Sequence, residues 1–224
     1  MKSHLSPGAI ALSRRCGVAE GSPVAQVELR QTGRIRSDPA RKWMKLSARQ
    51  TIDVRSCAFD WRATTGPFGA ISIRDALEPG GGRLEVKALG FLPIAREAAS
   101  PALNRGELMR YLAEVAWAPD AILANRELQW SDQGTDTLTI AAGVTSVVLT
   151  LGADGLIAQT FAPDRPRSTP GGFVPTPWRG NFWDYREISG RMIPCRASIS
   201  WTVDSVEQVY GEFSVTDWQL VQAS

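Results

Sequence analysis

The chain has 224 residues, a formal net charge of +2 and an ordinary apolar content of 43%. This length lies within the range of a single β-rich domain, and no shift in composition divides the chain. The balanced charge, without long runs of one sign, excludes the electrostatic footprint of a nucleic-acid-binding protein. One basic cluster surrounds a predicted turn at residues 37–40, where a solvated turn explains it better than a phosphate site. Its members are Arg34, Arg36, Arg41, Lys42 and Lys45.

The inventory of reactive side chains excludes several kinds of catalytic site. The three cysteines, Cys16, Cys57 and Cys195, are widely spaced and form no CxxC pair, and the single histidine is His4 near the terminus. A histidine-based triad, a zinc site built on histidine and a Cys–His nucleophile pair all need an imidazole on a rigid element. We therefore expect no metal site and no cofactor.

Targeting signals are weak. Residues 5–12 form the only candidate signal core, but this segment is short and contains Pro7 and Gly8. No apolar run reaches the length of a membrane-spanning helix. Together with an odd set of free thiols, which fits a reducing compartment, this pattern predicts a cytoplasmic protein without a transmembrane segment.

Strand signals occupy the first part of the chain after a polar lead-in at residues 1–22, which we expect to be partly disordered. Alternating apolar and polar residues separated by Gly, Pro and Asp turns predict five strands before residue 90. They cover residues 24–36, 43–54, 58–63, 70–76 and 83–89.

The strongly helical segment is residues 106–119, and it interrupts the strand signals. Apolar residues cover most of the helix surface, while Glu107, Arg110 and Glu114 fall on one narrow stripe, here called the charged seam. Asn104 is the predicted N-cap, and Pro119 ends the segment. The sequence therefore predicts one largely buried helix over about residues 104–117.

The second part of the chain returns to short strands, with turn residues at close spacing. The predicted strands cover residues 127–131, 136–142, 144–151, 155–161, 181–188, 195–203 and 209–221. Residues 162–180 contain five prolines, which predicts a long loop of the kind that covers sites. The charged part of this loop, residues 164–167, is equally compatible with a mobile solvent loop.

Together these elements predict a mainly β (α+β) fold. About eleven or twelve antiparallel strands would leave exposed faces on a flat sheet, so we expect one curved sheet that forms a half-barrel with the helix on its concave side. The chain divides into the lead-in at residues 1–22 and a single curved-sheet domain at residues 23–224.

Three motifs carry a family resemblance. They are GELxRYLxExxWxP at residues 106–119, PTPWRG at residues 175–180 followed by Asp184 and Tyr185, and GRMIP at residues 190–194 followed by Trp201. Over roughly residues 24–222 the chain resembles a family of bacterial proteins of unknown function, which is predicted to share the curved-sheet fold of the lipoprotein-carrier proteins of the bacterial envelope. In those carriers the fold encloses an apolar cavity for acyl chains, and the resemblance implies such a cavity here by analogy.

The candidate site residues come from the helix and from these motifs. The charged seam is either a neutralised ion network, which we favour, or the source of a general acid or base with a raised pKa. Asp184 and Tyr185 either join a ligand head group or serve a turn and packing, which is the preferred interpretation. The predicted ligand-binding set is Glu107, Arg110, Tyr111, Glu114, Trp117, Trp178, Asp184, Tyr185, Arg191 and Trp201.

Eight tryptophans are many for this length, and most of them must lie in the core. Trp117, Trp178 and Trp201 are candidates for the wall of an apolar site, with an indole N–H aimed at a polar head group, although core packing is the better expectation for each.

Three functions remain open from the sequence. The first is a soluble protein that binds or carries a lipid-like or other apolar small molecule in the concavity of the sheet, gated by residues 162–180. The second is an enzyme acting on a small molecule through Glu107 or Glu114 with Tyr111, Asp184 or Tyr185. The third is a structural module that oligomerises through an exposed sheet edge.

Overall fold

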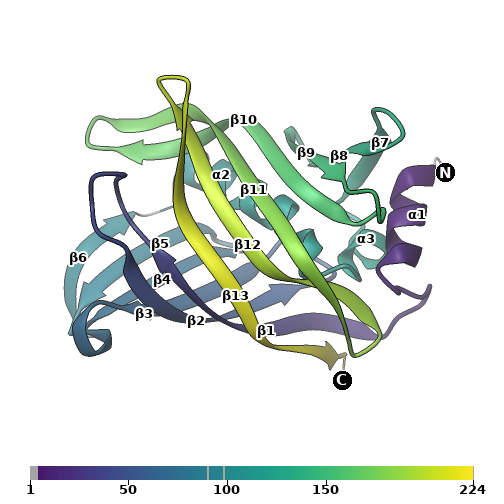
Figure 1. The fold of residues 1–224 in the computed structure, drawn as a ribbon, viewed down its shortest axis with the longest axis horizontal. Helices are drawn as coiled ribbons and strands as arrows, with labels where there is room; N and C mark the ends of the chain where they lie inside the picture. Colours follow the sequence, from purple (N-terminus) through teal and green to yellow (C-terminus); the bar gives the residue numbers. More distant parts are fainter. Residues whose placement is uncertain (1–4, 90, 98, 224) are drawn as a thin grey trace.

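The computed structural model describes residues 5–89, 91–97 and 99–223. Its main feature is one antiparallel sheet of thirteen strands with the order β6-β5-β4-β3-β2-β1-β13-β12-β11-β10-β9-β8-β7 (Figure 1). Strands that follow one another in the sequence are neighbours in the sheet, except β6 and β7, which form its two edges, and the first strand, β1, pairs with the last, β13. The strands are β1 (Val24–Ile35), β2 (Met44–Asp53), β3 (Phe59–Thr65), β4 (Ile71–Glu78), β5 (Gly81–Ala88), β6 (Leu92–Glu97), β7 (Gln129–Asp132), β8 (Thr137–Ala142), β9 (Thr145–Leu151), β10 (Ile157–Thr169), β11 (Gly172–Ile188), β12 (Arg191–Val203) and β13 (Val206–Gln222).

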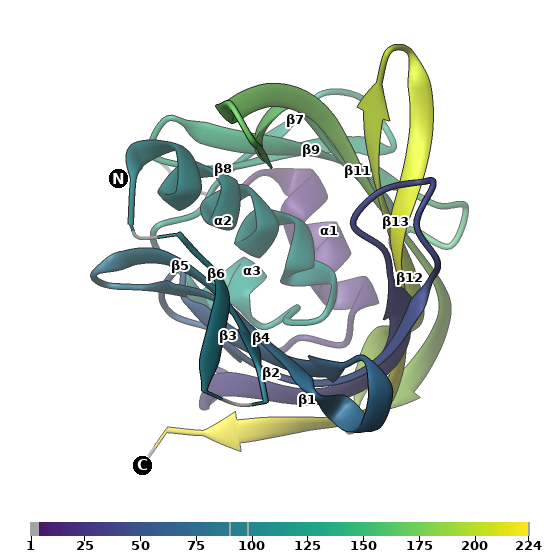
Figure 2. The ribbon, with the colours of Figure 1, turned by 90° about the vertical axis from the view of Figure 1, so that its left-hand side faces the viewer.

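The sheet curls around the helices. The helical elements are α1 (Pro7–Arg15), the 3-10 turn η1 (Pro67–Gly69), α2 (Pro101–Ala113), the 3-10 turn η2 (Glu114–Ala116) and α3 (Ala121–Ala124). Figure 2 looks into the curl and shows α2 surrounded by strands from both halves of the sheet. Helix α2 contacts β4 and β5 from the first half and β8, β9 and β10 from the second. The predicted fold class, a half-barrel with a helix on its concave side, is confirmed.

Helix α1 lies where the sequence analysis places no element. Ser6 is its N-cap and accepts a hydrogen bond from the Ala9 N–H at 3.2 Å, while Pro7 occupies the first turn. Ala9 and Leu12 are buried. The helix has only nine residues, so its apolar pattern is too short to be recognised as periodic.

Helix α2 begins three residues before the predicted start. Ser100, not Asn104, is its N-cap, because the Ser100 hydroxyl accepts a hydrogen bond from the Leu103 N–H at 3.1 Å. Asn104 lies inside the helix, and its side-chain oxygen accepts from the Gly82 N–H at 2.7 Å. The residue that the sequence predicts as a cap therefore joins α2 to the start of β5.

The prediction of a long loop at residues 162–180 is wrong. Strands β10 and β11 form a long hairpin there, with register pairs that include Pro166 opposite Pro175. In this part of the hairpin β10 and β11 pair with each other, since β9 pairs with residues 157–161 of β10 and β12 pairs with residues 178–188 of β11. Proline is tolerated where no further strand needs its N–H. Strand β6 was also missed, and it completes the thirteen.

The core lies inside the curl, where inward side chains of the strands meet α2. Its fully buried members include Leu29, Ile52, Tyr111, Leu112 and Leu149. Over the described ranges, no helix is long and apolar enough to cross a membrane.

Candidate functional site

A cavity of about 250 Å³ lies between the C-terminal part of α2 and the inner face of the sheet. Its wall is mostly aromatic and aliphatic, with a few charged and amide groups. The lining residues are Gln31, Ile35, Trp61, Ile73, Asp75, Leu84, Arg110, Glu114, Trp117, Arg165, Trp178, Phe182, Ala197, Ile199, Tyr210 and Phe213. Four of the predicted ligand-binding residues are in this wall, namely Arg110, Glu114, Trp117 and Trp178.

Arg110 is the centre of the charged seam. Its Nε donates to Glu114 Oε1 at 2.8 Å, one helical turn away, and its Nη1 donates to Asp75 Oδ2 on β4 at 2.5 Å. The guanidinium also lies over the rings of Phe59 and Trp61, at 4.8 and 5.2 Å from their centroids. A guanidinium paired in this way stabilises both carboxylates and fixes α2 against the sheet.

The two glutamates of the seam differ in their partners. Glu114 also accepts a hydrogen bond from the Gln50 side-chain amide at 2.5 Å. Glu107 is 5% exposed, and its nearest ion-pair contact is Arg165 Nη2 at 3.9 Å. Burial, together with the negative charge of Asp75, raises the pKa of Glu107 well above its usual range. The seam therefore consists of a paired Arg110–Glu114 unit and a carboxyl that favours its neutral form.

Arg165 contributes a second cation to the site from β10. The sequence left open whether residues 164–167 form a mobile solvent loop. Arg165 is instead buried, and its Nε donates to the Gly106 carbonyl at 3.1 Å. Its guanidinium stacks over Trp178 at 4.6 Å and lies 5.5 Å from the Trp201 ring centroid. Trp201 in turn stacks on Tyr210, with ring centroids 5.8 Å apart. Arg165 therefore joins α2 to an aromatic stack on the opposite strands.

The indole N–H groups of the wall bond to the protein itself. Trp61 donates to Gln31 Oε1 at 3.1 Å, Trp178 to the Tyr210 hydroxyl at 2.9 Å, and Trp117 to the Pro194 carbonyl at 3.0 Å. For Trp117 and Trp178, the expectation that the indole N–H points at a ligand head group is therefore wrong. What the tryptophans offer the cavity is apolar ring surface.

Two polar atoms at the cavity have no hydrogen-bond partner among the described residues when Glu107 is ionised. They are Nε2 of Gln31, a donor, and Oδ1 of Asp75, an acceptor. Gln31 is 2% exposed, so its free N–H is withheld from bulk solvent. A buried donor or acceptor without a partner costs about 1–3 kcal/mol, and a ligand that bonds to it recovers part of that cost.

The other predicted ligand-binding residues are not in the cavity wall. Tyr111 donates to the Asp53 carbonyl at 2.9 Å, and Tyr185 donates to the Ile157 carbonyl at 2.8 Å. Asp184 pairs with Arg186 at 2.8 Å. The Tyr111 contact joins the helix to β2, the Tyr185 contact joins β11 to β10, and the Asp184 pair lies within β11.

Arg191 is also remote from the cavity. It makes two 2.8 Å hydrogen bonds to the buried carboxylate of Asp120. The structure therefore does not bring Tyr111, Asp184, Tyr185 and Arg191 together with the charged seam on one ligand head group.

Several residues of the site were missed by the sequence analysis. Gln31, Gln50 and Asp75 occupy inward positions of alternating strands, where a polar side chain breaks the apolar pattern. That break was an available signal, because a polar group on the core face needs a partner. Arg165 had no such signal, since the prolines around it concealed the strand.

The model of a family of unknown function, DUF6544, matches residues 13–213. The chain belongs to this family. The sequence matches no curated protein.

Two solved structures share the fold. A LolA superfamily protein, NE2245 from Nitrosomonas europaea, is 13% identical with a TM-score of 0.50, over 96% of this chain and 94% of that one. A domain described as an outer membrane lipoprotein-sorting protein from Vibrio parahaemolyticus is 9% identical with a TM-score of 0.51, over 95% and 90% of the two chains. At this identity the likeness concerns the fold alone, and it agrees with the carrier-like curved sheet expected from the motifs.

Proposed function

We propose that this DUF6544 protein binds one small, largely apolar molecule in the cavity between α2 and the sheet. The observation that carries the proposal is the cavity itself, about 250 Å³ in volume and walled mainly by aromatic and aliphatic side chains. Transfer of apolar ligand surface from water into such a wall is favourable by roughly 25 cal/mol per Å². Concave, mostly apolar pockets with a few polar groups are the usual form of small-molecule sites.

The volume limits the size of the ligand. A water molecule takes up about 30 Å³ in the liquid, so the cavity holds the equivalent of about eight waters. Sites for drug-sized ligands are about 300–1,000 Å³. The ligand is therefore one compact ring system or one medium-length chain.

The polar groups limit its chemistry. The free amide donor of Gln31 needs an acceptor, whereas Oδ1 of Asp75 is served by the proton of the neutral Glu107 carboxyl. A hydroxyl or a primary amide supplies such an acceptor. With Glu107 in its neutral form, the charges of Arg110 and Arg165 balance those of Asp75 and Glu114, which favours an uncharged ligand.

A lipid-derived molecule is the first candidate. The Vibrio parahaemolyticus domain with this fold is described as lipoprotein-sorting. The cavity volume favours a single chain over the several chains of a lipidated protein.

We also propose a cytoplasmic location, which the cysteines support. Cys16, Cys57 and Cys195 are free, and burial is the main reason that the pKa of Cys16 and of Cys57 rises to about 12. Cell fractionation tests the location, and recovery with the contents of an oxidising compartment would contradict it.

The binding proposal is tested by titrating the protein with 1-octanol while tryptophan fluorescence is recorded. We expect a saturable change in the natural protein. Ala197→Leu fills the cavity from β12 and should weaken binding by at least about tenfold, since overpacking costs about 1–3 kcal/mol. Ala153→Leu, at an exposed turn, is the matched control and should bind like the natural protein. Equal affinity in the two variants would contradict binding in this cavity.

A further inference from the structure

The outer face of the sheet, opposite α2, carries a row of arginines across four strands. Arg30 on β1 is the register partner of Arg49 on β2, Arg49 of Arg62 on β3, and Arg62 of Arg74 on β4. Strands lie about 4.8 Å apart, so this arginine row extends over roughly 14 Å. Like charges directly opposite one another destabilise a sheet. Repulsion along the row is a local cost to stability, and such local costs are characteristic of functional sites.

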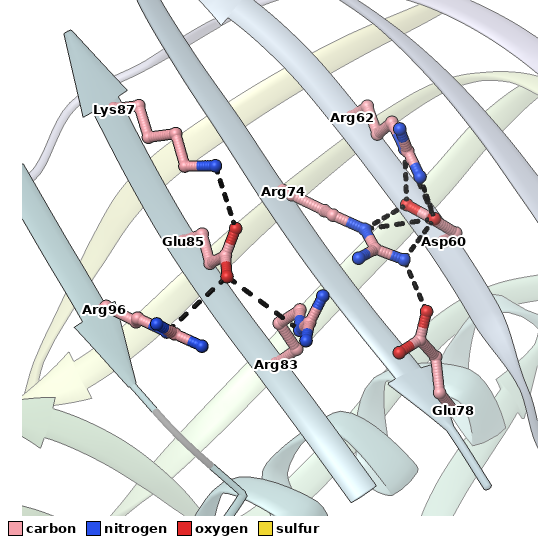
Figure 3. A network of polar contacts seen from close by, with 8 residues as sticks. All are labelled: Asp60, Arg62, Arg74, Glu78, Arg83, Glu85, Lys87 and Arg96. Carbon is pink, nitrogen blue, oxygen red and sulfur yellow. Dashed lines mark hydrogen bonds and ion pairs between the residues drawn. The ribbon is translucent and has the colours of Figure 1, made fainter. Parts of the chain in front are cut away.

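Carboxylates neutralise the arginine row only in part. Figure 3 shows Asp60 between Arg62 and Arg74, at 2.8 and 2.7 Å, with Glu78 also on Arg74. Asp217 lies 3.9 Å from Arg30 at the other end of the row.

Arg49 stands in the middle of the row. It makes no hydrogen bond or ion pair with another residue in the described ranges, and it lies between two further arginines. It is also exposed. The centre of the row therefore keeps an available cation.

A second row on the same face consists of hydroxyls. Thr32 is the register partner of Ser47, Ser47 of Thr64, and Thr64 of Ser72. This hydroxyl row is two residues along each strand from the arginine row, a separation of about 7 Å. Asp60 is two residues from Arg62 in the opposite direction, so it does not lie between the two rows.

The two rows line one open hollow of about 670 Å³. Beyond the rows, Lys87 adds a fifth cation, and Glu85 is the one carboxylate in the lining. Figure 3 shows Glu85 held among Lys87, Arg83 and Arg96, at 3.4 to 4.0 Å. The carboxylate in the hollow is thus already engaged by three cations.

We propose that this hollow binds a soluble molecule that carries two or more phosphate groups. The arginine fork matches the geometry of phosphate oxygens, and Ser and Thr hydroxyls donate to the same kind of acceptor. A tetrahedral phosphate lying between the rows takes donors from both. The arginine row is longer than a single phosphate group, and this favours a ligand that carries several phosphate groups.

The test is isothermal titration calorimetry of the full chain with inorganic tripolyphosphate at low salt. We expect saturable binding that weakens by at least about tenfold in Arg49→Gln, because a charge-assisted hydrogen bond is lost. Arg126→Gln, an exposed arginine outside the hollow, makes the same charge change and should alter affinity by less than about twofold. No saturable binding by the folded protein, or equal weakening in both variants, would overturn the proposal.

Thermal unfolding separates a binding role from a structural one. Without ligand, Arg49→Gln should raise the melting temperature, since it relieves like-charge repulsion. With tripolyphosphate the natural protein should gain stability and the variant should gain less. Binding to phosphatidylglycerol vesicles without binding to tripolyphosphate would overturn the soluble ligand and assign the hollow to a lipid surface.

Discussion

Glu107 is a buried carboxyl whose pKa is raised, first by burial and then by the charge of Asp75. A group with a higher pKa in the folded state holds its proton more tightly when folded. Its contribution to the free energy of unfolding is complete below the pKa of the unfolded chain and is lost as the pH rises toward the folded pKa. The protein should therefore lose stability above the ordinary pKa of glutamate.

Glu107→Gln tests this pH dependence, because the amide resembles the protonated carboxyl and does not ionise. The free energy of unfolding is measured with urea for both proteins at pH 4 and pH 8. We expect the difference, variant minus natural protein, to be larger at pH 8 than at pH 4. Glu187→Gln changes an exposed glutamate and serves as the control. A stability difference that is the same at both pH values would show that Glu107 ionises normally.

Arg110 offers a second test at the scale of single residues. Arg110→Ala leaves Asp75 and Glu114 without their cation, and removal of one partner from a buried ion pair costs about 3–5 kcal/mol. Arg126→Ala, on the surface, should cost no more than about 0.5 kcal/mol. Denaturant unfolding measures both, and similar small losses would mean that the seam contributes little to stability.

Among the elements, α2 positions the seam and the cavity wall. Its start is fixed by the Ser100 cap and by the bond from Gly82 to Asn104. Ser100→Ala should lower the free energy of unfolding by about 1 kcal/mol, as for other N-caps. Ser47→Ala, on the outer face of β2, is the matched control. Equal effects of the two changes would contradict a capping role for Ser100.

The sequence predicted the strands in which apolar and polar residues alternate without interruption. The predicted strand at residues 24–36 corresponds to β1 (Val24–Ile35), and that at residues 43–54 corresponds to β2 (Met44–Asp53). The β10–β11 hairpin was missed because proline is normally evidence against a strand, and only tertiary position decides whether its missing N–H matters. Helix α1 was missed because nine residues are too few for a periodic signal.

The candidate site was predictable only in part. The helical period identified Arg110 and Glu114, and the motif residues Trp117 and Trp178 also line the cavity. Asp75 and Arg165 come from strands remote in sequence, so their meeting with α2 depends on the sheet order and on the curl. Tyr185 and Arg191 belong to the same motifs, but they bond to Ile157 and Asp120 away from the cavity.

For the whole molecule, the fold determines where a site can form, and the side chains determine what fits there. The chain shares its fold with two structures of 13% and 9% identity. In this chain, large side chains from α2 and the strands fill most of the concavity, and a cavity of about 250 Å³ remains. Binding of one small molecule in this space is the central claim.

Native mass spectrometry of the purified protein, repeated after denaturation, tests that claim most directly. We expect a noncovalent adduct on the order of 150 Da, as eight water volumes imply, that is lost on denaturation and reduced in Ala197→Leu. Where the protein is isolated without ligand, incubation with 1-octanol should produce the adduct. A bare chain mass before and after that incubation, from protein shown to be folded, would contradict the claim.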